Sequence, residues 1–208
     1  FAFVLIGTFT LNSCSDDVSV PNETEIPTKK PLSFNIAVAS DTHYFDSSLL
    51  INDGKAFQEF LNTDRKLLSE SGAILDNLFE QIIKKQPELL IIPGDLTKDG
   101  EEISHIHFAQ KLKKVEDSGI KVLVIPGNHD INNPHAWKFD GEDTRPVKMV
   151  NPDQFKAIYK QFGYDEADQI EKGPKLSYVS EPLDGLWVIA IDASIYKNNI
   201  QENYPRTG

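Results

Sequence analysis

Residues 120–130 read IKVLVIPGNHD, a short apolar run followed at once by polar side chains. Residues 122–125 are apolar without alternation, which in so short a run indicates a buried strand. The Pro-Gly pair that follows ends the strand and turns the chain. Asn128, His129 and Asp130 are therefore expected at the carboxyl end of a strand, where open α/β sheets bind their ligands.

The same arrangement occurs twice upstream. Residues 35–43, NIAVASDTH, place Asp41 and His43 just after an apolar run, and residues 88–95, ELLIIPGD, place Asp95 after another. Because the carboxyl ends of parallel strands lie at one edge of a sheet, these side chains are expected to lie close together.

The remaining pattern predicts an α/β fold. Strands are expected at 34–39, 89–92 and 121–125, with a loop to about residue 62 and amphipathic helices at 64–85 and 101–118. This alternation favours a parallel sheet with right-handed crossovers. Residues 131–150 show no clear period, and a short helix is expected at 152–162. Two apolar runs at 176–179 and 186–191, joined by a turn at 182–185, predict an antiparallel hairpin.

Length and composition suit one globular domain with a tail. The chain has 208 residues, 39% hydrophobic and 25% charged, with a net charge of 21 − 32 = −11. General nucleic-acid binding requires a basic surface, which this acidic chain lacks. The single cysteine, Cys14, excludes a disulfide framework and a cysteine-type zinc site.

The N-terminus resembles part of a secretory signal. Residues 1–11 are apolar but shorter than the roughly 20 residues that span a bilayer. LNSC at residues 11–14 resembles a bacterial lipobox, with Cys14 as the lipidated residue. Residues 15–31 then form a flexible tether. These features predict an exported protein, lipid-anchored in the periplasm or at the outer membrane or cell surface of a Gram-negative-type bacterium. The alternative is a frayed apolar terminus with a chance cysteine.

The three polar segments resemble the first three motifs of the calcineurin-like metallophosphoesterases. They are Asp41-x-His43, Gly94-Asp95 and the GNHD of residues 127–130, and the resemblance covers residues 34–192. GDLTKDG at residues 94–100 also resembles the phosphodiesterase-like branch of that superfamily. The resemblance implies a four-layer α/β/β/α sandwich and makes residues 32–208 the N-terminal part of a catalytic domain.

The resemblance also implies a role for each motif residue. Two divalent metal ions, of Mn, Fe or Zn, would be bridged by Asp95, with Asp41 and His43 on the first ion and Asn128 on the second. His129 would act on the substrate as an acid or a phosphate ligand, and Asp130 would hold its other ring nitrogen. The polar residues could instead be simple caps of sheet ends, but the complete set favours a metal site.

The implied reaction is hydrolysis of a phosphate ester, small molecule or lipid, by a metal-bound hydroxide. A phosphodiester is favoured; the alternatives are a phosphomonoesterase and a surface lipoprotein that only binds a ligand. The family has two further motifs, an isolated histidine and Gly-His-x-His, which are not found among the five histidines here, at 43, 105, 107, 129 and 135. The first ion would keep three of four ligands and the second two. We therefore expect a C-terminally truncated or degenerate domain, and expect these 208 residues to be inactive by themselves.

Other polar residues carry weaker expectations. His105 is interpreted as a surface or packing histidine, and Asp192 as a hydrogen-bonded residue at a strand end. The loop after GNHD could border the pocket, where its basic residues would meet a substrate anion, or could be a solvated loop with one packing tryptophan. These loop residues are His135, Trp137, Lys138, Arg145 and Lys148.

Overall fold

The computed structural model describes residues 32–165, 168–169, 176–196 and 199. The expected signal, the lipobox cysteine Cys14 and the tether lie outside these residues. No helix in the described part of the chain combines the length and apolar character needed to cross a bilayer.

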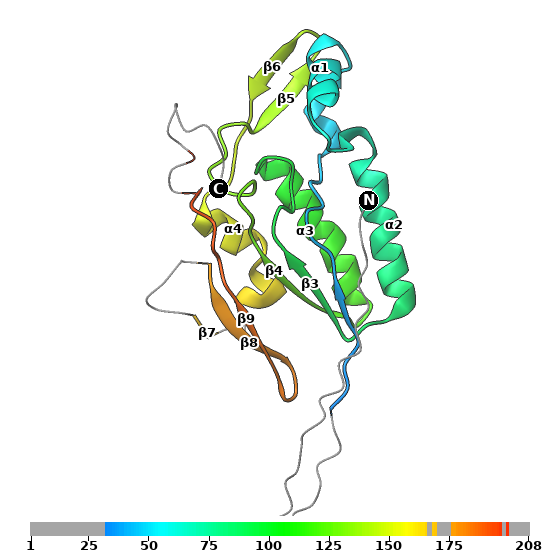
Figure 1. Ribbon diagram of the computed structural model, residues 1–208, viewed down its shortest axis with the longest axis vertical. Coiled ribbons are helices and arrows are strands. Elements are labelled where there is room, and N and C mark those ends of the chain that lie inside the picture. The colour runs from blue at the N-terminus through cyan, green and yellow to red at the C-terminus, as the bar shows by residue number, and fades with distance from the viewer. Residues whose placement is uncertain (1–31, 166–167, 170–175, 197–198, 200–208) are drawn as a thin grey trace, which may run out of the picture.

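A parallel sheet forms the centre of the fold. Its strands are β1 (Ile36–Val38), β3 (Leu89–Pro93) and β4 (Lys121–Ile125), in the order β1-β3-β4. All pairs are parallel, with Leu89 opposite both Ile36 and Lys121. The crossovers contain helices α2 (Leu68–Lys85) and α3 (Glu102–Asp117), which lie side by side in Figure 1. The predicted α/β class is confirmed.

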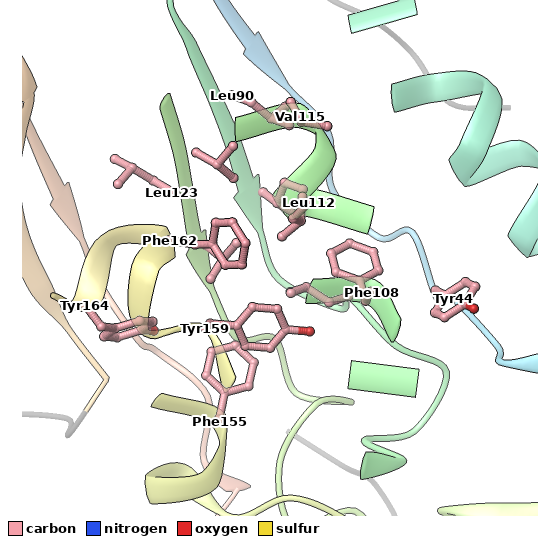
Figure 2. Packing of buried hydrophobic residues seen from close by; sticks show 14 of the residues in the cluster. Tyr44, Leu90, Phe108, Leu112, Val115, Leu123, Phe155, Tyr159, Phe162 and Tyr164 are labelled. Carbon is pink, nitrogen blue, oxygen red and sulfur yellow. The ribbon is translucent and has the colours of Figure 1, made fainter. Parts of the chain in front are cut away.

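The helices bury one face each against this sheet. Leu75, Phe79 and Ile82 of α2 are buried at spacings of three and four residues, as one helical face requires. Three residues of α3 repeat this pattern: Phe108, Leu112 and Val115. Together with the strand residues they form one core cluster, part of which is shown in Figure 2.

A second group of elements covers β4. Helix α4 (Pro152–Ile158) begins with a capping box between Asn151 and Gln154, and a π-helical turn, η2 (Lys160–Tyr164), follows it. Strands β7 (Asp168–Gln169), β8 (Tyr178–Leu183) and β9 (Leu186–Ala190) form an antiparallel sheet, which confirms the expected hairpin. The Tyr178 hydroxyl donates to the Val124 carbonyl at 2.8 Å and joins this sheet to β4.

The expectation of irregular loops from the end of the first strand to about residue 62 and over residues 131–150 was wrong. These segments contain a 3₁₀ turn, η1 (Ser47–Leu49), strand β2 (Leu50–Asn52), helix α1 (Lys55–Thr63), and strands β5 (Trp137–Asp140) and β6 (Asp143–Pro146). The strands form a small mixed sheet in the order β2-β5-β6. We call α1, β2, β5 and β6 the cap. Figure 1 shows it gathered at one end of the molecule, around its own cluster of Phe45, Leu49, Phe57, Leu68 and Phe139.

Candidate metal-binding and catalytic site

Backbone hydrogen bonds continue the parallel sheet beyond its strands and align the first two motif loops. The Asp41 amide donates to the Gly94 carbonyl at 3.2 Å, and the His43 amide donates to the Asp95 carbonyl at 3.0 Å. The loop after β1 therefore runs alongside the loop after β3. Asp41, His43 and Asp95 are brought together, although 52 residues separate the second from the third.

These three side chains form a compact cluster. One potential ligand atom from each lies within 4.8 Å of the others, and His43 Nε2 lies 3.9 Å from Asp95 Oδ2. All three residues have left-handed backbone conformations, with φ of 55° for Asp41, 41° for His43 and 47° for Asp95. Such conformations are unfavourable for residues with a Cβ and are concentrated at functional sites. The fold thus stores backbone strain at this cluster.

The cluster suits a divalent metal ion. Two carboxylates and an imidazole are ligands that Zn²⁺, Mn²⁺ and Fe²⁺ accept. Burial, followed by the charge of Lys66, lowers the pKa of His43, so the imidazole is neutral as a metal ligand must be. Among the described residues, buried His43 Nδ1 has no hydrogen-bond partner. A neutral imidazole with one nitrogen facing the Asp95 carboxylate fits the donor set of a metal site.

The third motif loop packs tightly against Asp95. A Cβ on Gly127 would lie 2.2 Å from Asp95 Oδ1, so only glycine permits this approach. The His129 amide donates to the same oxygen at 2.9 Å, and the rings of His43 and His129 meet edge to face with centroids 5.0 Å apart. Asn128 lies between Gly127 and His129 in this turn, beside the cluster. Its assignment to a second ion stays a prediction.

His129 is held by Asp99. Its Nδ1 lies 2.8 Å from Asp99 Oδ1, which leaves Nε2 as the nitrogen available to a substrate. Burial lowers the pKa of His129, but the hydrogen bond to Asp99 and the charges of Asp99 and Asp95 together outweigh burial, and the pKa is raised. Burial raises the pKa of Asp99, yet the His129 hydrogen bond and the Lys98 charge bring it down to about 2. The pair therefore combines an imidazole of raised proton affinity with a carboxylate that is ionised at neutral pH.

The expected contact between Asp130 and the His129 ring was wrong. Asp130 is fully buried and accepts from the backbone amides of Leu96 at 3.1 Å, Thr97 at 2.9 Å and Gly127 at 2.9 Å. Its carboxylate is thus directed at backbone donors and joins the loops after β3 and β4. Burial and the charge of Asp95 raise the pKa of Asp130 to about 7, against these three amides.

His105 has a packing role, one of the two roles expected for it. Its Nε2 lies 3.0 Å from the Asp130 carbonyl and its Nδ1 lies 2.8 Å from the Tyr159 hydroxyl, inside the core. Complete burial lowers its pKa to about 3, so the ring is neutral. Asp192 likewise matches its interpretation: it is buried after β9 and accepts from the Tyr196 hydroxyl at 2.7 Å.

Lys66 is a basic residue of the site that the sequence did not reveal. It lies in the link between α1 and α2, its side chain is 16% exposed, and its Nζ lies 3.7 Å from Asp64 Oδ2. Its charge acts to lower the pKa of His43, of His129 and of Asp99, so it acts both on the metal cluster and on the His129–Asp99 pair. Asp99, by contrast, lies within the segment GDLTKDG at residues 94–100, so its position in that motif was a sequence signal for a role beside His129.

The basic residues expected at the pocket border are paired with neighbours. Lys148 Nζ lies 2.6 Å from Glu102 Oε1, and Arg145 Nη2 lies 3.7 Å from Asp140 Oδ2. In each pair the cation is exposed and the carboxylate is partly buried. Lys138 is on β5, and the rings of His135 and Trp137 pack edge to face at 5.3 Å. A contact of these residues with substrate stays a prediction.

A comparison with known protein families adds one match. A family model described as calcineurin-like phosphoesterase matches residues 34–191, which include all three motif loops and all three sheets. No curated protein matches the chain significantly.

Proposed function

Because the chain belongs to the calcineurin-like phosphoesterase family, we propose that it is a hydrolase that cleaves phosphate esters with divalent metal ions bound at Asp41, His43 and Asp95. The observation that carries this proposal is the cluster itself. Three ligand side chains from two sheet-end loops converge within 4.8 Å, on strained backbone, at the place where α/β sheets bind ligands.

The finer proposal is a pair of ions. Asp95 would bridge them, Asp41 and His43 would hold the first, and Asn128 would contribute to the second. When bound, such ions neutralise phosphate charge and lower the pKa of water, which supplies the nucleophile and the charge sink that this acidic chain lacks. The amide of His129, which donates to Asp95 Oδ1 at 2.9 Å, would hold the bridging carboxylate in place.

The residues beside the cluster would handle the substrate. His129 Nε2 would donate a proton to the leaving oxygen, while Asp99 holds Nδ1 and keeps the ring oriented. The ammonium of Lys66 would attract the phosphate. A proton donor for the leaving group matters most for poor leaving groups such as alkoxides, so alkyl esters would gain most from His129. The preference for a phosphodiester over a monoester is proposed from the sequence GDLTKDG at residues 94–100.

The test compares the full-length protein with Asp95→Ala. Wild type loaded with Mn²⁺ or Zn²⁺ should hydrolyse bis(p-nitrophenyl) phosphate faster than p-nitrophenyl phosphate, and Asp95→Ala should lose bound metal and turnover together. Exposed Asp143, on β6 of the cap, provides the matched control, because Asp143→Ala removes a carboxylate that is not part of the metal cluster. Near-normal activity of Asp95→Ala would remove the metal hypothesis. Faster monoester cleavage would favour a phosphomonoesterase, and metal binding without turnover would favour a ligand-binding protein.

We further propose that the protein is exported and anchored through lipid on Cys14. The support is the sequence alone, with the apolar residues 1–11, the lipobox-like LNSC and the polar stretch behind it. Labelled fatty acid should be incorporated into the wild type and not into Cys14→Ala, which should leave the membrane fraction. Equal behaviour of the two proteins would make Cys14 an ordinary cysteine.

A further inference from the structure

Lys98 is a completely buried cation beside the site. Its side chain is 0% exposed, and its Nζ donates to Asp99, to Glu101 Oε1 at 3.3 Å and to the His135 carbonyl at 3.2 Å. Burial lowers its pKa, but the charges of Glu101 and Asp99 outweigh burial and raise it, so the ammonium keeps its charge. A buried ion pair is often no more stabilising than apolar residues of the same size. Stability alone is therefore a weak reason for this lysine.

Lys98 fixes the carboxylate that holds His129. It bonds Asp99 Oδ2, while Asp99 Oδ1 accepts from His129 Nδ1 at 2.8 Å and from Asn133 Nδ2 at 3.1 Å. The Asp99 amide in turn donates to Glu101 Oε2 at 3.1 Å. Both oxygens of Asp99 are thus hydrogen-bonded. This fixes the orientation of the carboxylate and of the His129 ring that donates to it.

The same ammonium contacts the cap. Nζ lies 5.0 Å from the ring centre of Phe60 on α1 and 5.9 Å from that of Phe139 on β5, two aromatic faces that attract a cation. Phe139 belongs to the cap cluster, and the His135 carbonyl precedes β5. Lys98 therefore joins the Asp99–His129 pair to two cap elements and to the loop after β4.

We propose that Lys98 is a positioning residue: it locks Asp99 in place, with support from Phe60 and Phe139, so that His129 is aimed at the leaving group. This inference rests on the proposed phosphoesterase function. It goes beyond that function by assigning the cap a part in catalysis, through a residue that touches neither metal nor substrate.

The experiment measures leaving-group dependence in metal-loaded, full-length protein. Aryl phosphodiesters with p-nitrophenol and with phenol as leaving groups are compared for wild type, Lys98→Met and Asp99→Asn. Misdirecting His129 should slow the phenol ester at least about tenfold more than the p-nitrophenol ester, because proton donation matters most for the poorer leaving group. Bound metal should not change. The double variant Lys98→Met/Asp99→Asn should be little slower than Asp99→Asn alone, because both act through one ring.

Lys111 gives a matched control. It lies on α3, is partly buried and lies 5.7 Å from the ring centre of Tyr44, and its ammonium pairs with Asp76 instead of Asp99. Lys111→Met should keep the wild-type ratio between the two esters. If Lys98→Met does not fold, Lys98→Met/Glu101→Gln removes one buried carboxylate charge together with the cation and is measured in its place.

Three results would overturn the proposal. Lys98→Met could keep wild-type rates, could slow both esters equally as a general structural defect would, or could act additively with Asp99→Asn. A wild type that hydrolyses neither diester would instead reject the proposed phosphodiesterase function. In that case the Nδ1 proton of His129, followed by NMR, still tests positioning: its signal should be lost in Lys98→Met and kept in Lys111→Met.

Discussion

His129 is fixed by two separate contacts, its amide on Asp95 at 2.9 Å and its ring on Asp99 at 2.8 Å. The first supports the metal cluster and needs only backbone, whereas the second orients the ring. His129→Asn should therefore keep bound metal and lose about 10²- to 10⁴-fold in rate, the usual contribution of an acid–base group. Elemental analysis and turnover measure the two effects. His107→Asn, on α3 beside Asp46, is the control, and metal loss in His129→Asn would contradict the assigned role.

Lys66 should act on substrate binding. Its ammonium is 16% exposed and is 3.7 Å from Asp64, beyond hydrogen-bond distance, so it can turn to a phosphate oxygen. Lys66→Met should raise KM about tenfold, the value of one hydrogen bond between charged groups, with a smaller change in kcat. Exposed Lys55, paired with Glu59, supplies the control Lys55→Met. An unchanged KM would show that Lys66 stays with Asp64.

At the scale of residues, the sequence was informative where side chains directly follow strands. Asp41, His43 and Asp95 were predicted as one cluster because parallel strands deliver their ends together. The partner of His129 was not predicted correctly, because adjacency in sequence says nothing about direction: Asp130 faces backbone amides while Asp99 reaches the ring. Lys66 had no sequence signal, since its position depends on how the link between α1 and α2 folds back.

At the scale of elements, local hydrophobic periodicity predicted the bounds of the strand and the helix that lead to the third motif loop. Strand β4 and helix α3 lie within one residue of their expected bounds. Helix α2 begins at Leu68 rather than at residue 64, because residues 64–67 form a turn in which the Lys66 amide donates to Asp64. The cap was missed because its strands pair over long distances, with Leu50 opposite Phe139, and β6 is exposed throughout.

The turn after β4 contains Gly127, which packs directly against Asp95. A methyl group on Gly127 would collide with Asp95, at 2.2 Å from Oδ1 and 2.4 Å from the amide nitrogen. Gly127→Ala should therefore weaken metal binding and lower the free energy of unfolding by about 1–3 kcal/mol, as overpacking does. Metal titration and urea unfolding measure both quantities.

Gly119 provides the comparison for Gly127. It has φ of 95° and open space around its Cβ position, at the end of β4 opposite to the site. Gly119→Ala should cost about 1–2 kcal/mol through backbone strain alone and leave metal binding unchanged. If Gly127→Ala bound metal like Gly119→Ala, close approach of the third loop would not be needed for the site.

At the scale of the whole molecule, the α/β class and the parallel sheet were predictable, because strands and helices alternate in the order that such folds require. The division of the core was not predictable. Tyr159, Phe162 and Tyr178 join the main cluster, whereas Phe57 and Phe139 form the cap cluster, and nothing in their local sequence separates the two groups. The position of the cap beside the site follows from these packing choices.

The acid stability of the molecule depends on the buried charges under the site. Asp99 has a pKa of about 2 in the fold, below its ordinary 3.8. A depressed pKa means that the unfolded chain binds the proton more readily, so this carboxylate stabilises the fold fully above pH 3.8 and loses its contribution as the pH falls toward 2. The difference corresponds to about 2 kcal/mol, of which about half should be lost at pH 3. The contribution of Asp130 to stability changes with pH in the opposite direction. Its pKa of about 7 in the fold lies above the ordinary value, so its contribution becomes unfavourable as the pH rises.

Comparing wild type with Asp99→Asn cancels the contributions of titrating groups that Asp99 does not contact. In metal-free protein, the difference in unfolding free energy between wild type and Asp99→Asn should be larger at pH 6 than at pH 3 by about 1 kcal/mol, since only the wild type has this carboxylate to protonate. Urea unfolding at the two pH values measures this difference. A constant difference for Asp99→Asn would mean that Asp99 titrates alike in the folded and unfolded chain. The ionised carboxylate assigned to the His129 pair would then be wrong.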